Sequence, residues 1–137
     1  MSDPAERLAA FLAQTPYARF LGLRAELAGD EMTAVLPFDD KLIGNAKWQA
    51  LHGGVLGAFM EMTALAQLAL TGEMARLPKP IDVTIEYLKI GRPLTTYARA
   101  DLRKVGLRVA NVHVEAWQDQ RAEPVAALRG HFLLARE

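Results

Sequence analysis

The sequence predicts an α+β domain in which one curved antiparallel sheet wraps around a single long helix. The run of residues 53–70 is long enough for a helix and is apolar nearly all round, so it must be enclosed on every side. The strands expected before and after it alternate apolar and polar residues, which is typical of antiparallel strands with one dry face. At 137 residues the chain has the size of one domain, and we expect a single domain over residues 1–137.

The first expected element is a short N-terminal helix. Asp3 suits the N-cap position and Pro4 suits the first helical position. The helix is expected to stop at Thr15, because the residue before a proline, here Pro16, disfavours the helical conformation.

Strands, one loop and the long helix account for the rest of the chain. The segment 39–49 has no periodicity and is predicted to be a loop, and Gly72 is suited to end the long helix. The order is therefore α-β-β-α-β-β-β-β. The alternating runs predict strands over residues 21–27, 32–36, 81–87, 98–103, 110–117 and 126–134.

Composition excludes several classes of function. Lysine plus arginine number 16 and aspartate plus glutamate number 16, so the basic excess that nucleic acids and anionic membranes attract is absent. The chain has no cysteine, which excludes disulfides, iron–sulfur clusters, thiolate zinc sites and a cysteine nucleophile. Glu61 lies in the middle of the most apolar stretch, and a central carboxylate is costly in a bilayer span. We expect a cytoplasmic protein that binds neither nucleic acid nor membrane.

The most informative motif is the start of the long helix, where His52 precedes Gly53 and Gly54. Backbone N–H groups in a first helical turn have no partner inside the helix, and the helix dipole favours negative charge there. Glycine also lets a ligand approach the backbone closely. These features suit an oxyanion hole for an acyl carbonyl, with the Gly53 N–H as the candidate donor.

Glu61 is the candidate base or nucleophile, because burial in an apolar helix raises the pKa of a carboxyl group. The alternative is a structural ion pair or a solvated notch. Gly53 and Glu61 are eight residues apart, which corresponds to about 12 Å along the helix and about 80° around it. One carbonyl cannot contact both in one chain, so joint action of these residues requires a dimer with two equivalent sites.

Two further residues near the helix start have both functional and structural interpretations. His52 could position substrate, carry a proton or bond the Asn45 loop, or it could be a structural residue of the helix start. Asn45 could donate its amide to a carbonyl oxygen, or it could form a turn after Gly44. His113 and His131 lie in predicted strands and form no metal-binding spacing with His52.

His52-Gly53-Gly54 followed by the acid Glu61 resembles the hot-dog-fold acyl-CoA thioesterases, and the phenylacetate-pathway-type (PaaI-like) group most of all. The resemblance covers the order of elements over about the whole chain. It implies a homodimer, often paired into a homotetramer, that hydrolyses an acyl-CoA. It also implies that the Gly53 N–H polarises the thioester carbonyl, that Glu61 acts from the opposing subunit, and that His52 and Asn45 belong to the site. No cofactor is implied beyond the coenzyme A of the substrate.

The resemblance also implies a binding site for coenzyme A. In similar proteins, basic residues at the strand ends often contact the nucleotide of coenzyme A. Ordinary solvated surface charges are an equally good interpretation of the basic residues in this chain. The candidate residues for substrate and coenzyme A binding are Gly54, Lys89, Arg92, Lys104, Gly106 and Arg108.

The sequence departs from the resembled group at several positions. The acid is more often aspartate there, whereas Glu61 is one methylene longer. The asparagine usually stands six residues before the histidine, whereas Asn45 stands seven before His52. Gln49 replaces a frequent glycine, and Pro80 stands where some relatives have a serine or threonine.

Two other functions remain open on the sequence. A hydroxyacyl-thioester dehydratase on the same fold would share the acid, but its longer His-Phe-Pro-Gly segment is missing. A non-catalytic acyl-CoA-binding domain would be expected to lack the acid, and Glu61 argues against it.

Overall fold

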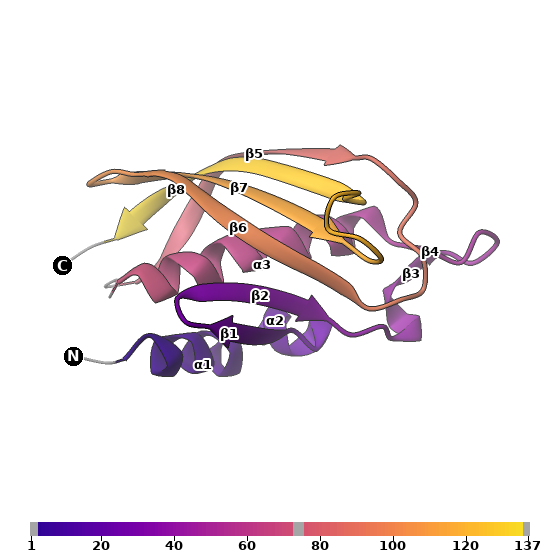
Figure 1. Cartoon of the computed structure of the whole chain (residues 1–137), viewed down its shortest axis with the longest axis horizontal. Helices are drawn as coiled ribbons and strands as arrows, with labels where there is room; N and C mark the ends of the chain where they lie inside the picture. Colours follow the sequence, from indigo (N-terminus) through magenta and orange to yellow (C-terminus); the bar gives the residue numbers. More distant parts are fainter. Residues whose placement is uncertain (1–2, 73–75, 136–137) are drawn as a thin grey trace.

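A computed structural model describes residues 3–72 and 76–135 of the chain. Six strands form one antiparallel sheet in the order β1-β2-β6-β7-β8-β5, and a second sheet contains only β3 and β4. The long helix α3 lies in the concave side of the larger sheet, with α1 and α2 beside it (Figure 1). The predicted fold class is confirmed. The helices are α1 (Pro4–Gln14), α2 (Pro16–Leu21) and α3 (Gly53–Thr71), with a short 3-10 helix η1 at Asp40–Leu42. The strands are β1 (Arg24–Ala28), β2 (Glu31–Leu36), β3 (Ile43–Asn45), β4 (Ala50–Leu51), β5 (Arg76–Tyr87), β6 (Thr96–Val105), β7 (Val109–Trp117) and β8 (Ala126–Ala135).

The N-terminal helix begins as its capping residues predict. The Asp3 carboxylate accepts a hydrogen bond from the Ala5 N–H at 2.8 Å, and Pro4 opens the helix. Helix α1 packs on α3, where the Arg7 guanidinium donates to the carbonyls of Ala69 and Leu70, each at 2.9 Å. These carbonyls lack partners inside α3, so Arg7 satisfies the C-terminal end of the buried helix.

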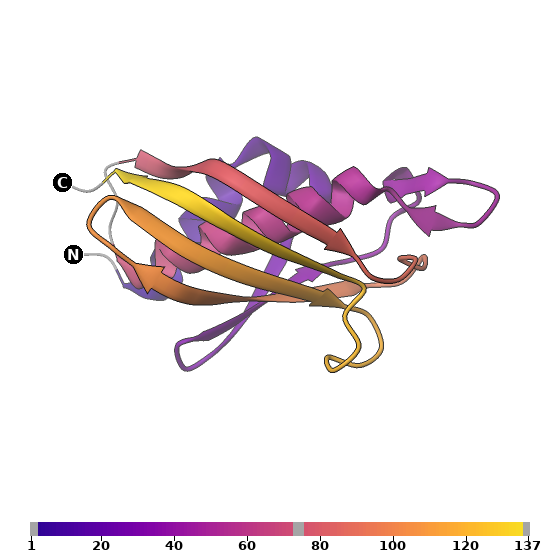
Figure 2. The same cartoon turned by 90° about the horizontal axis from the view of Figure 1, so that it is seen from above.

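Three predictions about local structure are wrong. The strand expected from residue 21 begins at Arg24, because Pro16 starts a second short helix that ends at Leu21 and Gly22 takes a left-handed conformation (φ 73°). The expected loop 39–49 contains η1 and β3, and β3 pairs with β4 in a hairpin that projects beyond the body of the molecule (Figure 2). Strand β5 begins five residues before the predicted start, because the prolines at 78 and 80 hide its alternation.

Helix α3 is long and apolar enough to cross a membrane by composition alone. Of its most apolar window, 67% is buried within the fold, which is how the core helix of a water-surrounded domain behaves. Its fully buried side chains include Phe59, Met60 and Leu68, which pack against the inward residues of the sheet. The sheet therefore supplies the enclosure that an all-round apolar helix requires.

The two edge strands of the large sheet differ in length and chemistry. Strand β1 has five residues, two of them the charged Arg24 and Glu26. Strand β5 has twelve residues and exposes large apolar side chains, with Ile81 55% exposed. A long edge strand with exposed apolar side chains is a template for pairing with another chain, so β5 offers the larger edge for such pairing, although it also carries charged residues and two prolines.

Candidate active site

The N-terminus of α3 presents one backbone donor that has no partner among the described residues. The His52 carbonyl accepts from the N–H groups of Val55 and Leu56, at 3.0 and 3.2 Å. The Gly54 N–H donates to the Nδ1 atom of His52 at 2.9 Å. Within residues 3–72 and 76–135, the Gly53 N–H makes no hydrogen bond. This donor lies at the positive end of the helix dipole and is available to an oxyanion.

Tyr87, the last residue of β5, covers the same turn of helix from the side. Its hydroxyl donates to the Gly53 carbonyl at 2.8 Å. A Cβ atom at position 53 would lie 3.3 Å from the Tyr87 ring, which is tighter than ordinary contact. A glycine at this position therefore allows the helix start and the end of β5 to meet.

Glu61 lies on the side of α3 that turns toward β5. One turn earlier, a Cβ atom on Gly57 would come within 2.8 Å of the Ile85 Cδ1 atom, so this side of the helix faces β5. Residues four apart share a helix face, which places Glu61 on the same strip, next to the free edge of the sheet. Its side chain is half-buried and makes no ion pair or hydrogen bond with any residue that the structure describes. Burial raises the pKa of the Glu61 carboxyl above its ordinary value.

The structure gives His52 and Asn45 structural hydrogen bonds. His52 is the N-cap of α3, and its own N–H donates to the Leu42 carbonyl at 2.9 Å. The Asn45 Oδ1 atom accepts from the Trp48 N–H at 3.1 Å, which closes the turn between β3 and β4. These are the bonds that the structural interpretations predict, and they leave the Asn45 amide N–H₂ without a hydrogen bond within the described part of the chain.

The predicted basic residues divide between the two ends of the sheet. Lys89 pairs with Glu123 at 3.1 Å and Arg92 pairs with Asp119, both at the end where α3 begins. The other candidates lie at the far end, near the end of β6 and in the turn between β6 and β7, where β5 also begins. Within one chain the structure does not bring these two groups together. The residues at the far end are Lys104, Gly106 and Arg108.

Two basic residues that the sequence analysis missed accompany Arg108. Arg76 and Lys79, at the start of β5, line a cavity of about 550 Å³ with Arg108 and a group of apolar side chains. None of these three cations forms an ion pair with a residue that the structure describes. The prolines that hide the start of β5 also hide these residues, because the alternation signal begins only at residue 81. The apolar part of the lining consists of Leu77, Leu107, Leu133, Leu134 and Ala135.

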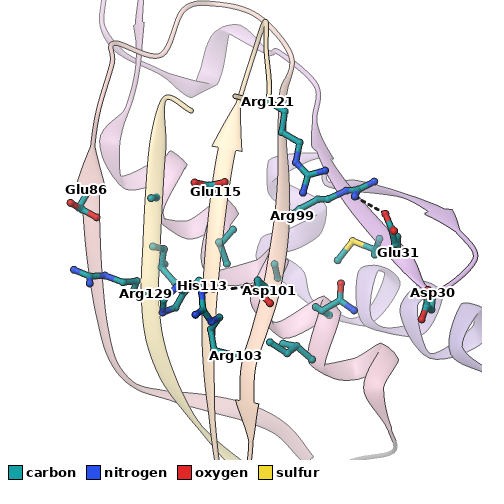
Figure 3. A pocket seen from close by; sticks show the side chains of 17 residues that line it. Asp30, Glu31, Glu86, Arg99, Asp101, Arg103, His113, Glu115, Arg121 and Arg129 are labelled. Carbon is teal, nitrogen blue, oxygen red and sulfur yellow. Dashed lines mark hydrogen bonds and ion pairs between the residues drawn. The ribbon is translucent and has the colours of Figure 1, made fainter. Parts of the chain in front are cut away.

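A cavity of about 830 Å³ lies over the outer face of the sheet and reaches α3 only at Gln67 (Figure 3). Its wall contains ion pairs between charged side chains: Arg99 pairs with Glu31 at 2.6 Å, and Arg103 pairs with Asp101 at 3.6 Å. No predicted site residue lines this cavity. The candidate active site is therefore at the start of α3 and the free edge of β5.

The chain is similar to known proteins over almost all its length. A family model described as the thioesterase superfamily matches residues 49–125. A solved protein from Chromobacterium violaceum is 38% identical, with a TM-score of 0.76 over 96% of this chain and 91% of that one. No sequence among the curated proteins matches significantly.

Two neighbours at lower identity show the fold alone. The PaaI protein of the Escherichia coli phenylacetic acid degradation operon is 20% identical, with a TM-score of 0.82 over 96% of this chain and 92% of that one. A phenylacetic acid degradation-related protein from Ralstonia eutropha is 21% identical, with a TM-score of 0.77 over 93% of this chain and 98% of that one.

Proposed function

Because the chain belongs to the thioesterase superfamily, we propose that it hydrolyses the thioester of an acyl-CoA at a site shared by two copies of the chain. The family expected from the sequence, the hot-dog-fold thioesterases, is confirmed, and membership assigns thioester hydrolysis as the general chemistry. The acyl-CoA substrate, the dimer and the roles of individual residues are the proposal. It includes a cytoplasmic location, with which a chain free of cysteine is compatible.

One observation carries the proposal: a single helix holds both an unused backbone donor and an unpartnered acid. The Gly53 N–H has no bond partner, and Glu61 has a raised pKa and no counter-charge in the described part of the chain. Eight residues of helix separate them, about 12 Å along the axis, so one thioester cannot contact both in one chain. A second copy of the helix, running antiparallel, would place the acid of one chain beside the glycine of the other.

The free edge of β5 supplies a way to bring that second copy. Antiparallel pairing of two β5 strands about a two-fold axis joins two sheets into one and covers the exposed apolar residues of the edge. Gly53 lies against Tyr87 and Gly57 against Ile85, so α3 runs alongside β5. A two-fold axis near Ile85 therefore makes the two α3 helices antiparallel neighbours as well.

The reaction follows from the charges at the shared site. The thioester carbonyl oxygen accepts a hydrogen bond from Gly53, which stabilises the oxyanion as the carbonyl carbon becomes tetrahedral. Glu61 of the partner subunit either removes a proton from the attacking water or attacks the carbon itself, forming an anhydride that water then cleaves. The carbon–sulfur bond breaks, the thiolate of coenzyme A takes the proton, and the products are the free acid and coenzyme A. The reaction needs no metal or redox cofactor.

The phosphates of coenzyme A require cationic side chains, and the chain has two groups of basic residues that could bind them in the dimer. With a two-fold axis near Ile85, the cavity of Arg76, Lys79 and Arg108 would lie about seven residues, or roughly 23 Å along the strand, from the Gly53 end of the other chain, which is closer than the Gly53 end of its own chain. Lys89 and Arg92 already lie at that end, although each is paired with a carboxylate. We assign the phosphates to the unpaired group.

The test is an assay of hydrolysis with a panel of acyl-CoAs that vary in chain length and aromaticity, in which the free thiol that is released is measured. Wild-type protein should hydrolyse at least one acyl-CoA of the panel. Glu61→Gln should hydrolyse none of them but should still bind the acyl-CoA that wild type hydrolyses. Hydration of a 2-enoyl-CoA without hydrolysis would favour the dehydratase alternative. Binding without any turnover would favour the acyl-CoA-binding domain.

A further inference from the structure

We propose that Tyr87 is a positioning residue that fixes the peptide unit between Gly53 and Gly54, and through it the direction of the Gly53 N–H. This inference rests on the proposed function, because it concerns the oxyanion donor of that site. It adds a residue of β5 to a site otherwise built from the helix start.

The peptide unit between the two glycines is held on both sides. Its carbonyl oxygen, from Gly53, accepts the Tyr87 hydroxyl at 2.8 Å. Its N–H, from Gly54, donates to the Nδ1 atom of His52 at 2.9 Å. The carbonyl has two lone pairs, so it can accept the phenol in addition to the helical bond from the N–H four residues on.

A double glycine needs such a clamp more than other sequences do. Glycine has no Cβ to restrict its backbone, and the first turn of a helix lacks bonds to a preceding turn. The Gly53 N–H belongs to the preceding peptide unit, whose His52 carbonyl accepts from the N–H groups of Val55 and Leu56. The unit after Gly53 is therefore the one that side chains must hold if the two units are to keep a fixed relation at this flexible glycine. An oxyanion donor is effective only when it points at the oxyanion before the reaction begins.

The ring of Tyr87 adds a second constraint. Its atoms lie 3.3 Å from the place where a Cβ atom on Gly53 would stand, so the ring blocks one side of the glycine. Tyr87 ends the strand that we expect to form the dimer edge, and its side chain is 54% exposed in the single chain. Dimer formation would therefore order the same side chain that holds the oxyanion donor.

Tyr87→Phe tests this directly, because it removes the hydroxyl and keeps the ring. The matched control is Tyr97→Phe on β6, whose ring stacks on Trp117 and whose hydroxyl makes no hydrogen bond within the described residues. We expect Tyr87→Phe to lower kcat about 10-fold, the effect of one hydrogen bond to an oriented group, with KM within about twofold of wild type. Tyr97→Phe should leave both unchanged.

A second readout does not depend on activity. In the substrate-free protein, the Gly54 amide should exchange with solvent at least about threefold faster in Tyr87→Phe than in wild type or Tyr97→Phe. If the exchange rates and kcat of Tyr87→Phe both equal those of wild type, the inference is wrong. Faster exchange with unchanged kcat would also overturn it, because the clamp would then have no role in the reaction. A wild-type protein inactive on every acyl-CoA would refute the proposed function instead, and the exchange rates would still decide whether the clamp exists.

Discussion

Gly57 of α3 lies against Ile85 of β5 so closely that a Cβ atom on the glycine would stand 2.8 Å from the Ile85 Cδ1 atom. The helix thus lies directly against the free edge strand at this point, and Glu61, one turn later on the same face, lies beside that edge. A methyl group at position 57 would require the end of the Ile85 side chain to move.

Gly57→Ala should leave the free energy of unfolding within about 1 kcal/mol of wild type, because the atom in conflict is the free end of the Ile85 side chain, which can rotate away. Overpacking costs about 1–3 kcal/mol, and the better helix propensity of alanine offsets about 1 kcal/mol of that cost. Ile85→Val removes the atom in conflict, so Gly57→Ala in that background should be neutral or stabilising. Urea unfolding of the four variants measures this. A larger loss in the wild-type background would contradict this prediction, because the Ile85 side chain would then not move aside.

Gly44→Ala should reduce kcat/KM by about 10-fold or more, because small displacements of site residues have large effects on rate. A Cβ atom at position 44 would lie 2.7 Å from the Cα atom of His52, and backbone cannot move aside as a side-chain end can. His52 caps α3, so its displacement would disturb the Gly53 donor. Gly72→Ala is the control, since a Cβ atom there would have no heavy atom of the described residues within 4 Å, its chain neighbours aside. Equal activity of Gly44→Ala and Gly72→Ala would contradict this prediction.

Glu61 should make both activity and stability depend on pH. Burial raises the pKa of this carboxyl. On the acid side of the pH profile, kcat/KM should therefore decline at a pH above the ordinary glutamate pKa of about 4.3. The folded state holds the proton more tightly than the unfolded state. The favourable contribution of Glu61 to the free energy of unfolding is therefore complete below about pH 4.3, and it is lost as the pH rises through the pKa that the carboxyl has in the folded state.

Glu61→Gln does not titrate, so its stability relative to wild type should increase from pH 4 to pH 7. Urea midpoints at the two pH values measure the difference. A variant less stable than wild type at pH 7 would support the structural ion-pair interpretation of Glu61.

The β5 edge should control assembly and activity together. Ile81→Lys places a charge on the apolar edge, where Ile81 is 55% exposed, and should shift a dimer toward monomer with a parallel loss of turnover. Leu27→Lys changes a residue of similar chemistry, 37% exposed, on the opposite edge strand β1 and should do neither. Sedimentation velocity at micromolar concentration distinguishes the two. A fully active monomer of Ile81→Lys would refute the shared site.

The sequence predicted the fold well where one physical signal dominates. The all-round apolar helix and the alternating strands required a sheet around α3, and Asp3 and Pro4 marked the first helix correctly. Prediction failed where signals are short or conflict, as at α2 and the three-residue β3, which are too brief to show a period.

The candidate site was only partly predictable for a related reason. Gly53 and Glu61 could be identified from the sequence, because both lie on one predicted helix and their spacing gives the distance between them. Tyr87 gave no signal, because its partner is a backbone carbonyl 34 residues away. Arg76 and Lys79 lie in a stretch whose prolines mask the strand. Long-range contacts of single side chains leave no periodic pattern in a sequence.

Complementation between two inactive chains tests the shared site most directly. Gly53→Pro deletes the oxyanion N–H, yet proline suits a first helical position and His52 before it is extended (φ −63°, ψ 131°), as a residue before proline prefers. Gly53→Ala, which keeps the N–H and adds a Cβ atom, controls for contact with Tyr87. The loss should be about 10²-fold or more for proline and much smaller for alanine.

Equal amounts of Gly53→Pro and Glu61→Gln chains, unfolded and refolded together, form heterodimers that keep one site with an intact glycine and an intact acid. Random pairing makes half of the dimers heterodimers, each with one active site of two, so the account predicts recovery of about a quarter of wild-type activity. No recovery, with heterodimers demonstrated by differential tagging, would contradict the account, because Gly53 and Glu61 would then not act across the interface.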